Sequence, residues 1–152
     1  MAKEIERKWL IDEFKDYIFG LNPPKVLIKQ GYVLVESEKQ LRLRLADCKT
    51  FLCLKYTDNI VRDEYEYEIP LQDGLEILAK CEWKLEKMRA TICSGLDIYE
   101  VDYYPNDLMV AEIEFKSKEE AESYTPPFFF GEEITGNREY SNITLAKQNL
   151  HF

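Results

Sequence analysis

The chain has 152 residues, of which 45% are hydrophobic and 32% charged, and its formal net charge is −9. We expect one domain, residues 1–152, because this length can bury a core and this hydrophobic content excludes a disordered chain. No uncharged run approaches the ~18 residues of a membrane helix, and residues 1–8 lack the apolar segment of a secretory signal. These features predict a cytoplasmic protein that contacts neither membrane nor nucleic acid, since its acidic balance weakens long-range attraction to anions.

Eight segments have the composition of β-strands and are separated mostly by short polar or Gly/Pro turns. The connections at 36–38, 57–59, 94–95 and 105–107 suit antiparallel neighbours, which predicts that much of the sheet is a meander. The expected strands are 2–10, 26–35, 39–46, 50–57, 61–70, 87–94, 97–104 and 107–116.

Helix signals lie between and after these strands. Asp73 is expected to cap one helix, and Ser117 with Glu120 has the spacing of a capping box before a second. Asn142 is expected to cap a last helix, and a shorter helix is expected within residues 12–21. We expect these helices to lie around a sheet that dominates the fold.

The cysteines and the single histidine do not suggest a catalytic or zinc site. The histidine, His151, is the penultimate residue, where chains commonly fray, so histidine acid–base catalysis is not expected. The cysteines lack the paired spacing of zinc sites and are interpreted as ordinary buried or strand thiols. They are Cys48, Cys53, Cys81 and Cys93.

Charged residues alternate with apolar ones along most strands, so each of these strands has one charged face. Two structures explain this alternation: a sheet with one solvated face, which is the commoner cause, or a closed barrel of eight strands that encloses its charged faces. We predict the second, an all-β dominated α+β fold built on a closed, eight-stranded antiparallel β-barrel with a few peripheral helices. The side chains expected to point inward are Lys8, Arg42, Arg44, Lys55, Arg62, Lys87 and Arg89, with Glu4, Glu6, Glu64, Glu66, Asp102, Glu112 and Glu114.

This inward set holds as many bases as acids, which limits what it binds. Burying so many charges in a dry interior would cost several kcal/mol per ion, so the interior must be wet and open. Both signs together suit an anion that arrives with a metal, because arginine and lysine bind phosphoryl oxygens while carboxylates bind Mg²⁺ or Mn²⁺. A structural lattice of salt bridges is the alternative that this pattern leaves open.

The opening EIERK, residues 4–8, matches an E-x-E-x-K signature, and with the motifs that follow it the chain resembles the CYTH family, also called triphosphate tunnel metalloenzymes. Near the end, FGEEIT (130–135) and YSN (140–142) resemble the closing motif of that family, although Glu139 stands where small bacterial members often have a basic residue and Arg138 lies one position earlier. The other matching segments are IKQGY (28–32), LRLR (41–44), LK (54–55), RDEYE (62–66), EKMR (86–89), VD (101–102) and AEIEF (111–115).

The resemblance implies an eight-stranded antiparallel tunnel and metal-dependent hydrolysis of inorganic triphosphate to pyrophosphate and phosphate. It implies Mg²⁺ or Mn²⁺ as cofactor, and it assigns to Lys87 the catalytic role of assisting the leaving phosphate. The residues implied in triphosphate binding are Lys8, Arg42, Arg44, Lys55, Arg62, Lys87 and Arg89. Those implied in metal binding are Glu4, Glu6, Asp102, Glu112 and Glu114, with Glu64 and Glu66 as further acidic positions.

Other functions fit the same pattern. Adenylyl cyclases and nucleoside, RNA or thiamine triphosphatases share this tunnel, and a non-catalytic polyphosphate-binding module is an alternative of another class. Inorganic tripolyphosphate is the expected substrate because the resemblance is to small members without an appended domain and no base-recognition segment is evident. A homodimer formed through the apolar barrel exterior is left open.

Overall fold

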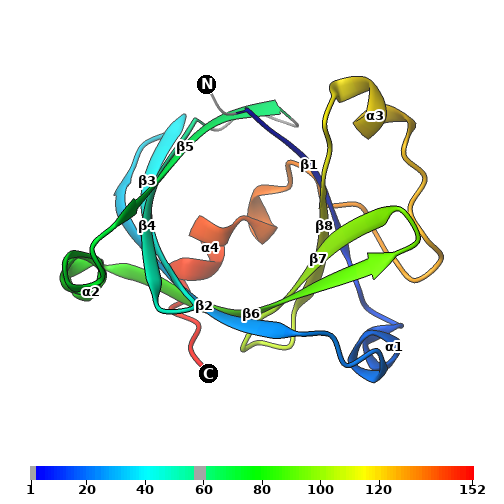
Figure 1. The fold of residues 1–152 in the computed structure, drawn as a ribbon, viewed down its shortest axis with the longest axis horizontal. Helices are drawn as coiled ribbons and strands as arrows, with labels where there is room; N and C mark the ends of the chain where they lie inside the picture. The colour runs from blue at the N-terminus through cyan, green and yellow to red at the C-terminus, as the bar shows by residue number, and fades with distance from the viewer. Residues whose placement is uncertain (1–2, 57–60) are drawn as a thin grey trace.

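The computed structural model describes residues 3–56 and 61–152, and in it eight strands close into one antiparallel barrel (Figure 1). The strands are β1 (Lys3–Leu10), β2 (Lys25–Val35), β3 (Lys39–Ala46), β4 (Lys49–Tyr56), β5 (Val61–Ile69), β6 (Trp83–Ser94), β7 (Asp97–Tyr103) and β8 (Met109–Glu114). Around the barrel their order is β1-β5-β4-β3-β2-β6-β7-β8, so the predicted fold is confirmed.

Two meanders account for most of the barrel. Strands β2 to β5 are consecutive neighbours, as are β6 to β8, and β1 closes the barrel between β5 and β8. Strand β6 begins at Trp83 rather than at residue 87, because residues 83–86 continue the pairing of β6 with β2. The turn expected at 57–59 lies outside the described residues.

Within the described residues, four helices and one 3₁₀ turn surround or close the barrel: α1 (Lys15–Gly20), α2 (Leu71–Lys80), α3 (Lys118–Ser123), η1 (Arg138–Tyr140) and α4 (Asn142–Ala146). Ser117 accepts a hydrogen bond from the backbone N–H of Glu120 at 3.1 Å, which confirms the cap of α3. None of the helices in the described ranges has both the length and the apolar character needed to cross a membrane.

The other two expected caps were wrong. Asp73 lies inside the first turn of α2, where Pro70 occupies the N-cap position without a side-chain hydrogen bond. Helix α4 is capped by Ser141, whose Oγ accepts from the N–H of Thr144 at 3.3 Å. Asn142 is therefore the first residue of α4, and its side chain makes other contacts.

Helix α2 packs tightly on the outside of the barrel wall. A Cβ on Gly74 would lie 2.4 Å from the side chain of Thr50 on β4, and a Cβ on Gly31 of β2 would lie 2.7 Å from the Sγ of Cys81. Larger side chains at either glycine would push the helix away, since such contacts are shorter than van der Waals separation. This close packing holds α2 against the part of the barrel wall that contains β2 and β4.

Apolar residues form two cores, one outside the barrel and one at one of its ends. Outside, Trp9 of β1 packs against Phe130 with ring centroids 5.0 Å apart, in a cluster that includes Tyr99 and Ile113. The second core joins inward-facing residues of the strands to the segment around α4, and Figure 1 shows α4 across the barrel opening. This core, which we call the closed end, contains Leu10, Tyr32, Leu85, Tyr104, Val110, Ile134, Leu145 and Ala146.

Candidate functional site

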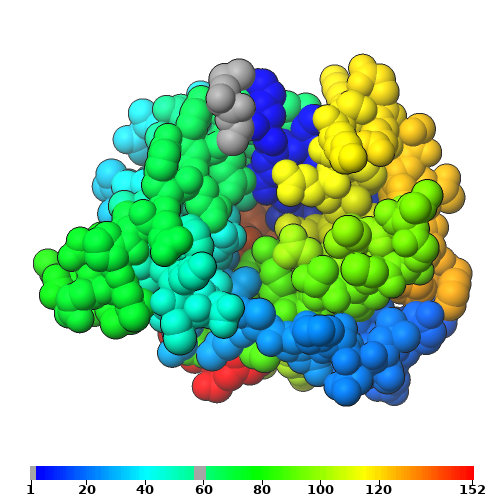
Figure 2. Space-filling model, viewed as in Figure 1, coloured from blue at the N-terminus to red at the C-terminus, as the bar shows by residue number. Residues whose placement is uncertain are grey.

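A cavity of about 770 Å³ occupies the interior of the barrel and is lined by side chains from all eight strands. Figure 2 shows it as a hollow at the centre of the molecule. We call it the tunnel cavity. The predicted site residues that line it are Glu4, Glu6, Lys8, Arg42, Arg44, Lys55, Glu64, Glu66, Lys87, Arg89, Glu112 and Glu114.

Two predicted site residues, Arg62 and Asp102, do not line the tunnel cavity. Arg62 lines a second cavity of about 410 Å³, which shares Glu6 and Lys8 with the tunnel cavity, and it forms an ion pair with Glu6. Arg138 lies in the second cavity as well. Asp102 is only 1% exposed and is opposite Arg89 in the strand register, where it contacts the cavity-lining Lys87 and Arg89 without lining the cavity itself.

Lys87 is fully buried at the centre of a hydrogen-bond network. Its Nζ donates to Oδ2 of Asp102 at 2.8 Å and to Oδ1 of Asn142 at 3.4 Å, while the hydroxyl of Tyr104 donates to the same Asn142 oxygen at 2.7 Å. Arg89 donates to both oxygens of Asp102, at 2.8 and 3.0 Å. The network joins β6, β7 and the first turn of α4.

Burial dominates the protonation equilibrium of Lys87. It lowers the pKa of Lys87 to about 8, although the carboxylate of Asp102 acts in the opposite direction. Burial alone would raise the pKa of Asp102, but the attraction of Lys87 and Arg89 holds it well below its usual range. Asp102 therefore remains an anion that orients both cations. Lys87 is mostly protonated at neutral pH, although burial disfavours its charge.

Elsewhere in the tunnel cavity, Lys55 and Lys8 are each shared between two carboxylates. Nζ of Lys55 lies 3.0 Å from Glu4 and 3.7 Å from Glu64. Nζ of Lys8 lies 3.4 Å from Glu6 and 3.9 Å from Glu112. The pairs at 3.4–3.9 Å are looser than a direct charge-assisted hydrogen bond, so phosphoryl oxygens and a cation could replace them without breaking short contacts.

The carboxylates of β1 and β8 are crowded. Burial raises the pKa of Glu114, and the nearby negative charges of Glu4 and Glu6 raise it further. Glu6 is opposite Glu114 in the register of these two strands, and Lys8 is opposite Glu112. Oxygen-only donors in such a cluster fit a hard divalent cation such as Mg²⁺ or Mn²⁺.

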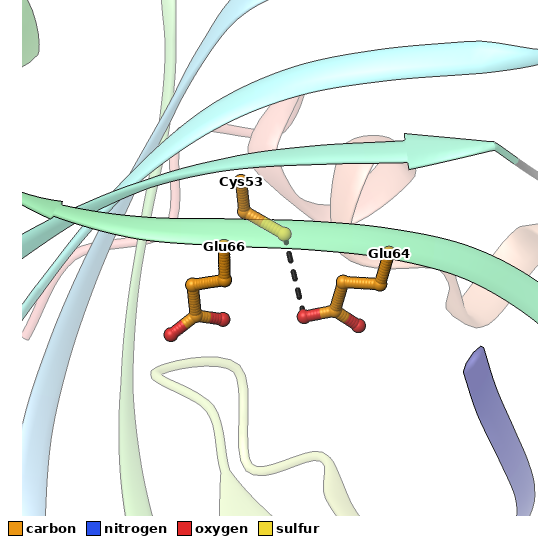
Figure 3. Close-up of side chains that lie close together, drawn as sticks. All are labelled: Cys53, Glu64 and Glu66. Carbon is orange, nitrogen blue, oxygen red and sulfur yellow. Dashed lines mark hydrogen bonds between the residues drawn. The ribbon is translucent and has the colours of Figure 1, made fainter. Parts of the chain in front are cut away.

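Cys53 faces the tunnel between two acidic side chains (Figure 3). Its Sγ donates to Oε1 of Glu64 at 3.4 Å, and one ligand atom each from Cys53, Glu64 and Glu66 lie within 4.8 Å of one another. Burial raises the pKa of Cys53 to about 11, so the thiol remains protonated and is a poor ligand at neutral pH. Only the two carboxylates of this group are suitable for a hard metal. All four cysteines are free thiols.

Gln30, Glu100 and Asn142 line the tunnel cavity but were not among the predicted site residues. Alternation along the strands would have placed Gln30 and Glu100 on the inward faces, since each lies two residues from another inward position. Asn142 reaches Lys87 from a helix 55 residues later, and no local pattern predicts that contact.

The chain is similar over nearly its whole length to proteins named inorganic triphosphatase. One, from Acetivibrio thermocellus, is 36% identical over 97% of this chain and 95% of its own length, and one from Nitrosomonas europaea is 33% identical over 94% and 96%. A crystal structure of an inorganic triphosphatase matches with a TM-score of 0.66 and 32% identity, covering 96% of this chain and 95% of that one. No protein-family model matches the chain.

A more distant structure, from Pyrococcus horikoshii, shares the fold with a TM-score of 0.60 at 21% identity and covers 78% of this chain and 83% of its own. The similarity to each of the two named relatives spans at least 94% of this chain. The chain therefore belongs to the family of these inorganic triphosphatases, the CYTH or triphosphate tunnel metalloenzyme family that its motifs resemble.

Proposed function

We propose that this protein hydrolyses inorganic tripolyphosphate to pyrophosphate and phosphate inside the tunnel cavity, with Mg²⁺ or Mn²⁺ as cofactor. The observation that carries the proposal is the joint lining of one cavity by six of the seven predicted bases and a set of carboxylates. The bases are Lys8, Arg42, Arg44, Lys55, Lys87 and Arg89. The relatives named inorganic triphosphatase support this choice of substrate.

The arrangement meets the requirements of phosphoryl transfer, which are positioning and neutralisation of charge rather than covalent catalysis. Arg44, Lys55 and Arg89 would hold the phosphoryl oxygens. A water oxygen bonds to a terminal phosphorus while the bond from that phosphorus to the bridging oxygen breaks, and pyrophosphate leaves. A divalent ion would be held by Glu4, Glu6, Glu112 and Glu114, and when bound it would neutralise phosphoryl charge.

Lys87 is the proposed catalytic residue because it is a fixed cation in the lining of the tunnel cavity, where it would offset the charge that develops on the departing oxygen. Asp102 and Asn142 fix its Nζ by accepting its hydrogen bonds. In a buried position, a fixed cation stabilises developing charge more strongly than it would in water. We propose that Asp102 acts through Lys87 and Arg89 rather than as a metal ligand, since both of its oxygens accept from these cations.

A self-sufficient lattice of salt bridges explains the same charges less well. In the part of the chain that the structure describes, the buried Nε atoms of Arg42 and Arg62 have no hydrogen-bond partner. A closed lattice would pair such groups, because a buried donor without a partner destabilises the folded state. The unpaired Nε–H groups of these two arginines support the interpretation that the cavity binds an anion.

A substrate panel tests the proposal. The protein is incubated with tripolyphosphate, ATP, thiamine triphosphate or pyrophosphate, with Mg²⁺, with Mn²⁺ or with EDTA, and phosphate, pyrophosphate and cyclic AMP are measured separately. We expect metal-dependent release of phosphate from tripolyphosphate, faster than from ATP. Cyclic AMP with pyrophosphate from ATP would identify a cyclase instead, and binding of tripolyphosphate without any product would identify a binding module.

A further inference from the structure

Gln30 of β2 is a neutral amide in a wall of charged side chains. It is only 1% exposed and it lines the tunnel cavity. Its Nε2 is buried and has no hydrogen-bond partner within residues 3–56 and 61–152. A buried donor of this kind lowers stability unless something accepts its hydrogen bond, so it is unusual in a folded protein.

The strand register places Gln30 at the floor of the tunnel cavity. It is opposite Arg44 of β3 on one side and opposite Leu85 of β6 on the other. Leu85 belongs to the apolar closed end, whereas Arg44 lines the cavity. Two positions further along the same two strands, Ile28 is opposite Lys87, so Gln30 and Lys87 are diagonal neighbours on the inner face.

The strand that carries Gln30 has little freedom to move. The next residue, Gly31, lies against Cys81 and Leu78 of the α2 region so closely that a Cβ there would be 2.7 Å from the Cys81 Sγ and 2.8 Å from the Leu78 Cδ1. Gln30 is also paired on both sides, with β3 and with β6. The backbone that carries the amide is therefore held in place before any ligand arrives, which lowers the entropic cost of using it.

We infer that Gln30 is a substrate-contacting residue whose Nε2 donates a hydrogen bond to a phosphoryl oxygen of tripolyphosphate at the floor of the cavity. This inference rests on the proposed function. The lysines and arginines around it attract phosphate by charge, whereas an amide adds a directional donor without changing the charge of the site. Because the floor is apolar beyond Gln30, the phosphoryl group that it contacts is the one inserted deepest, and it must carry no organic substituent.

Two substitutions at this position test the contact. Gln30→Met keeps the length of the side chain and removes both polar atoms, and Gln30→Glu keeps the shape but replaces the N–H donors with a negative oxygen. We expect the Met variant to bind tripolyphosphate, measured by calorimetry with Ca²⁺ to limit turnover, roughly tenfold more weakly than wild type. The Glu variant should bind more weakly still. Gln40→Met, on β3 in the second cavity, is the matched control and should bind as wild type does.

The melting temperature of the free protein separates a ligand contact from a structural role. Gln30→Met removes a buried donor that has no partner, so the free variant should melt at the wild-type temperature or above it. A lower melting temperature overturns the assignment whatever the affinity, because the amide would then stabilise the protein itself. Unchanged affinity in Gln30→Met, or tighter binding by Gln30→Glu than by Gln30→Met, overturns it as well.

The same experiment distinguishes failure of this inference from failure of the proposed function. If wild type binds and hydrolyses tripolyphosphate while the Gln30 variants match it, only the role of Gln30 is wrong. If wild type neither binds nor hydrolyses tripolyphosphate, the proposed function is wrong and the contact assigned to Gln30 is withdrawn with it.

Discussion

Replacing Lys87 with methionine should stabilise the protein while abolishing most of its activity. Methionine has nearly the same length but carries no charge. Burial holds the pKa of Lys87 at about 8 instead of 10.5, and a difference of this size corresponds to about 3 kcal/mol against the charged form. Asp102 would keep its two hydrogen bonds from Arg89, so the substitution does not leave an unpaired buried carboxylate.

For a chain of this size, about 3 kcal/mol corresponds to a rise in melting temperature of roughly 6–12 °C. Thermal and urea unfolding at pH 7, compared with Lys84→Met on the outer face of the same strand, would measure it. The kcat for tripolyphosphate should fall more than KM rises, because Lys87 acts on charge that develops in the transition state.

The pH dependence of this stability difference has a definite sign. Between about pH 8 and 10.5 unfolded lysine binds a proton that the folded protein has released, so the stability of wild type rises with pH. The advantage of Lys87→Met should therefore be largest below pH 8 and should disappear near pH 10.5. If Lys87→Met destabilises the protein at pH 7, the ion pair with Asp102 is net stabilising and this reasoning is refuted.

Three further predictions concern the pH dependence of activity, the metal requirement and ligand binding. For the free enzyme, kcat/KM should fall as pH rises through about 8, because Lys87 loses its proton there; a pH–rate profile that stays flat to pH 10 would contradict the role of this cation. Glu4→Gln and Glu112→Gln should each require more Mg²⁺ for half-maximal rate while leaving the melting temperature of the free protein close to that of wild type, and unchanged metal titrations in both would remove them from the metal site. Tripolyphosphate with Ca²⁺ should stabilise wild type by about 2.7 kcal/mol at a hundredfold excess over Kd, and Arg42→Ala or Arg44→Ala should reduce this gain; an equal gain in both variants would show that the ligand binds elsewhere.

The barrel and most of its lining could be predicted from the sequence because strand alternation is a local property. Alternation assigns Glu4, Glu6 and Lys8 to one face of a strand. In the predicted closed barrel, this charged face points into the interior. The resemblance of the motifs to the family also indicated a closed barrel rather than an open sheet.

Depth along the tunnel could not be predicted, because alternation gives the face of a side chain but not the level at which neighbouring strands pair. Arg62 has the correct face but lies in the second cavity, and Asp102 is buried against Lys87 and Arg89 without lining the tunnel cavity. The sequence predicted Asn142 only as a helix cap. Its contact with Lys87 could not be predicted, because that contact depends on how α4 closes the barrel. Register and closure are tertiary properties that single-strand patterns do not contain.

The central claim, that the tunnel cavity binds tripolyphosphate and a divalent cation together, is tested most directly by a crystal structure of the protein with tripolyphosphate and Ca²⁺. The account predicts three phosphoryl groups inside the barrel, within hydrogen-bond distance of Arg44, Lys55 and Arg89, with the cation on the carboxylates of β1 and β8. Tripolyphosphate bound outside the barrel, with the ion pairs of the tunnel cavity unchanged, would contradict it.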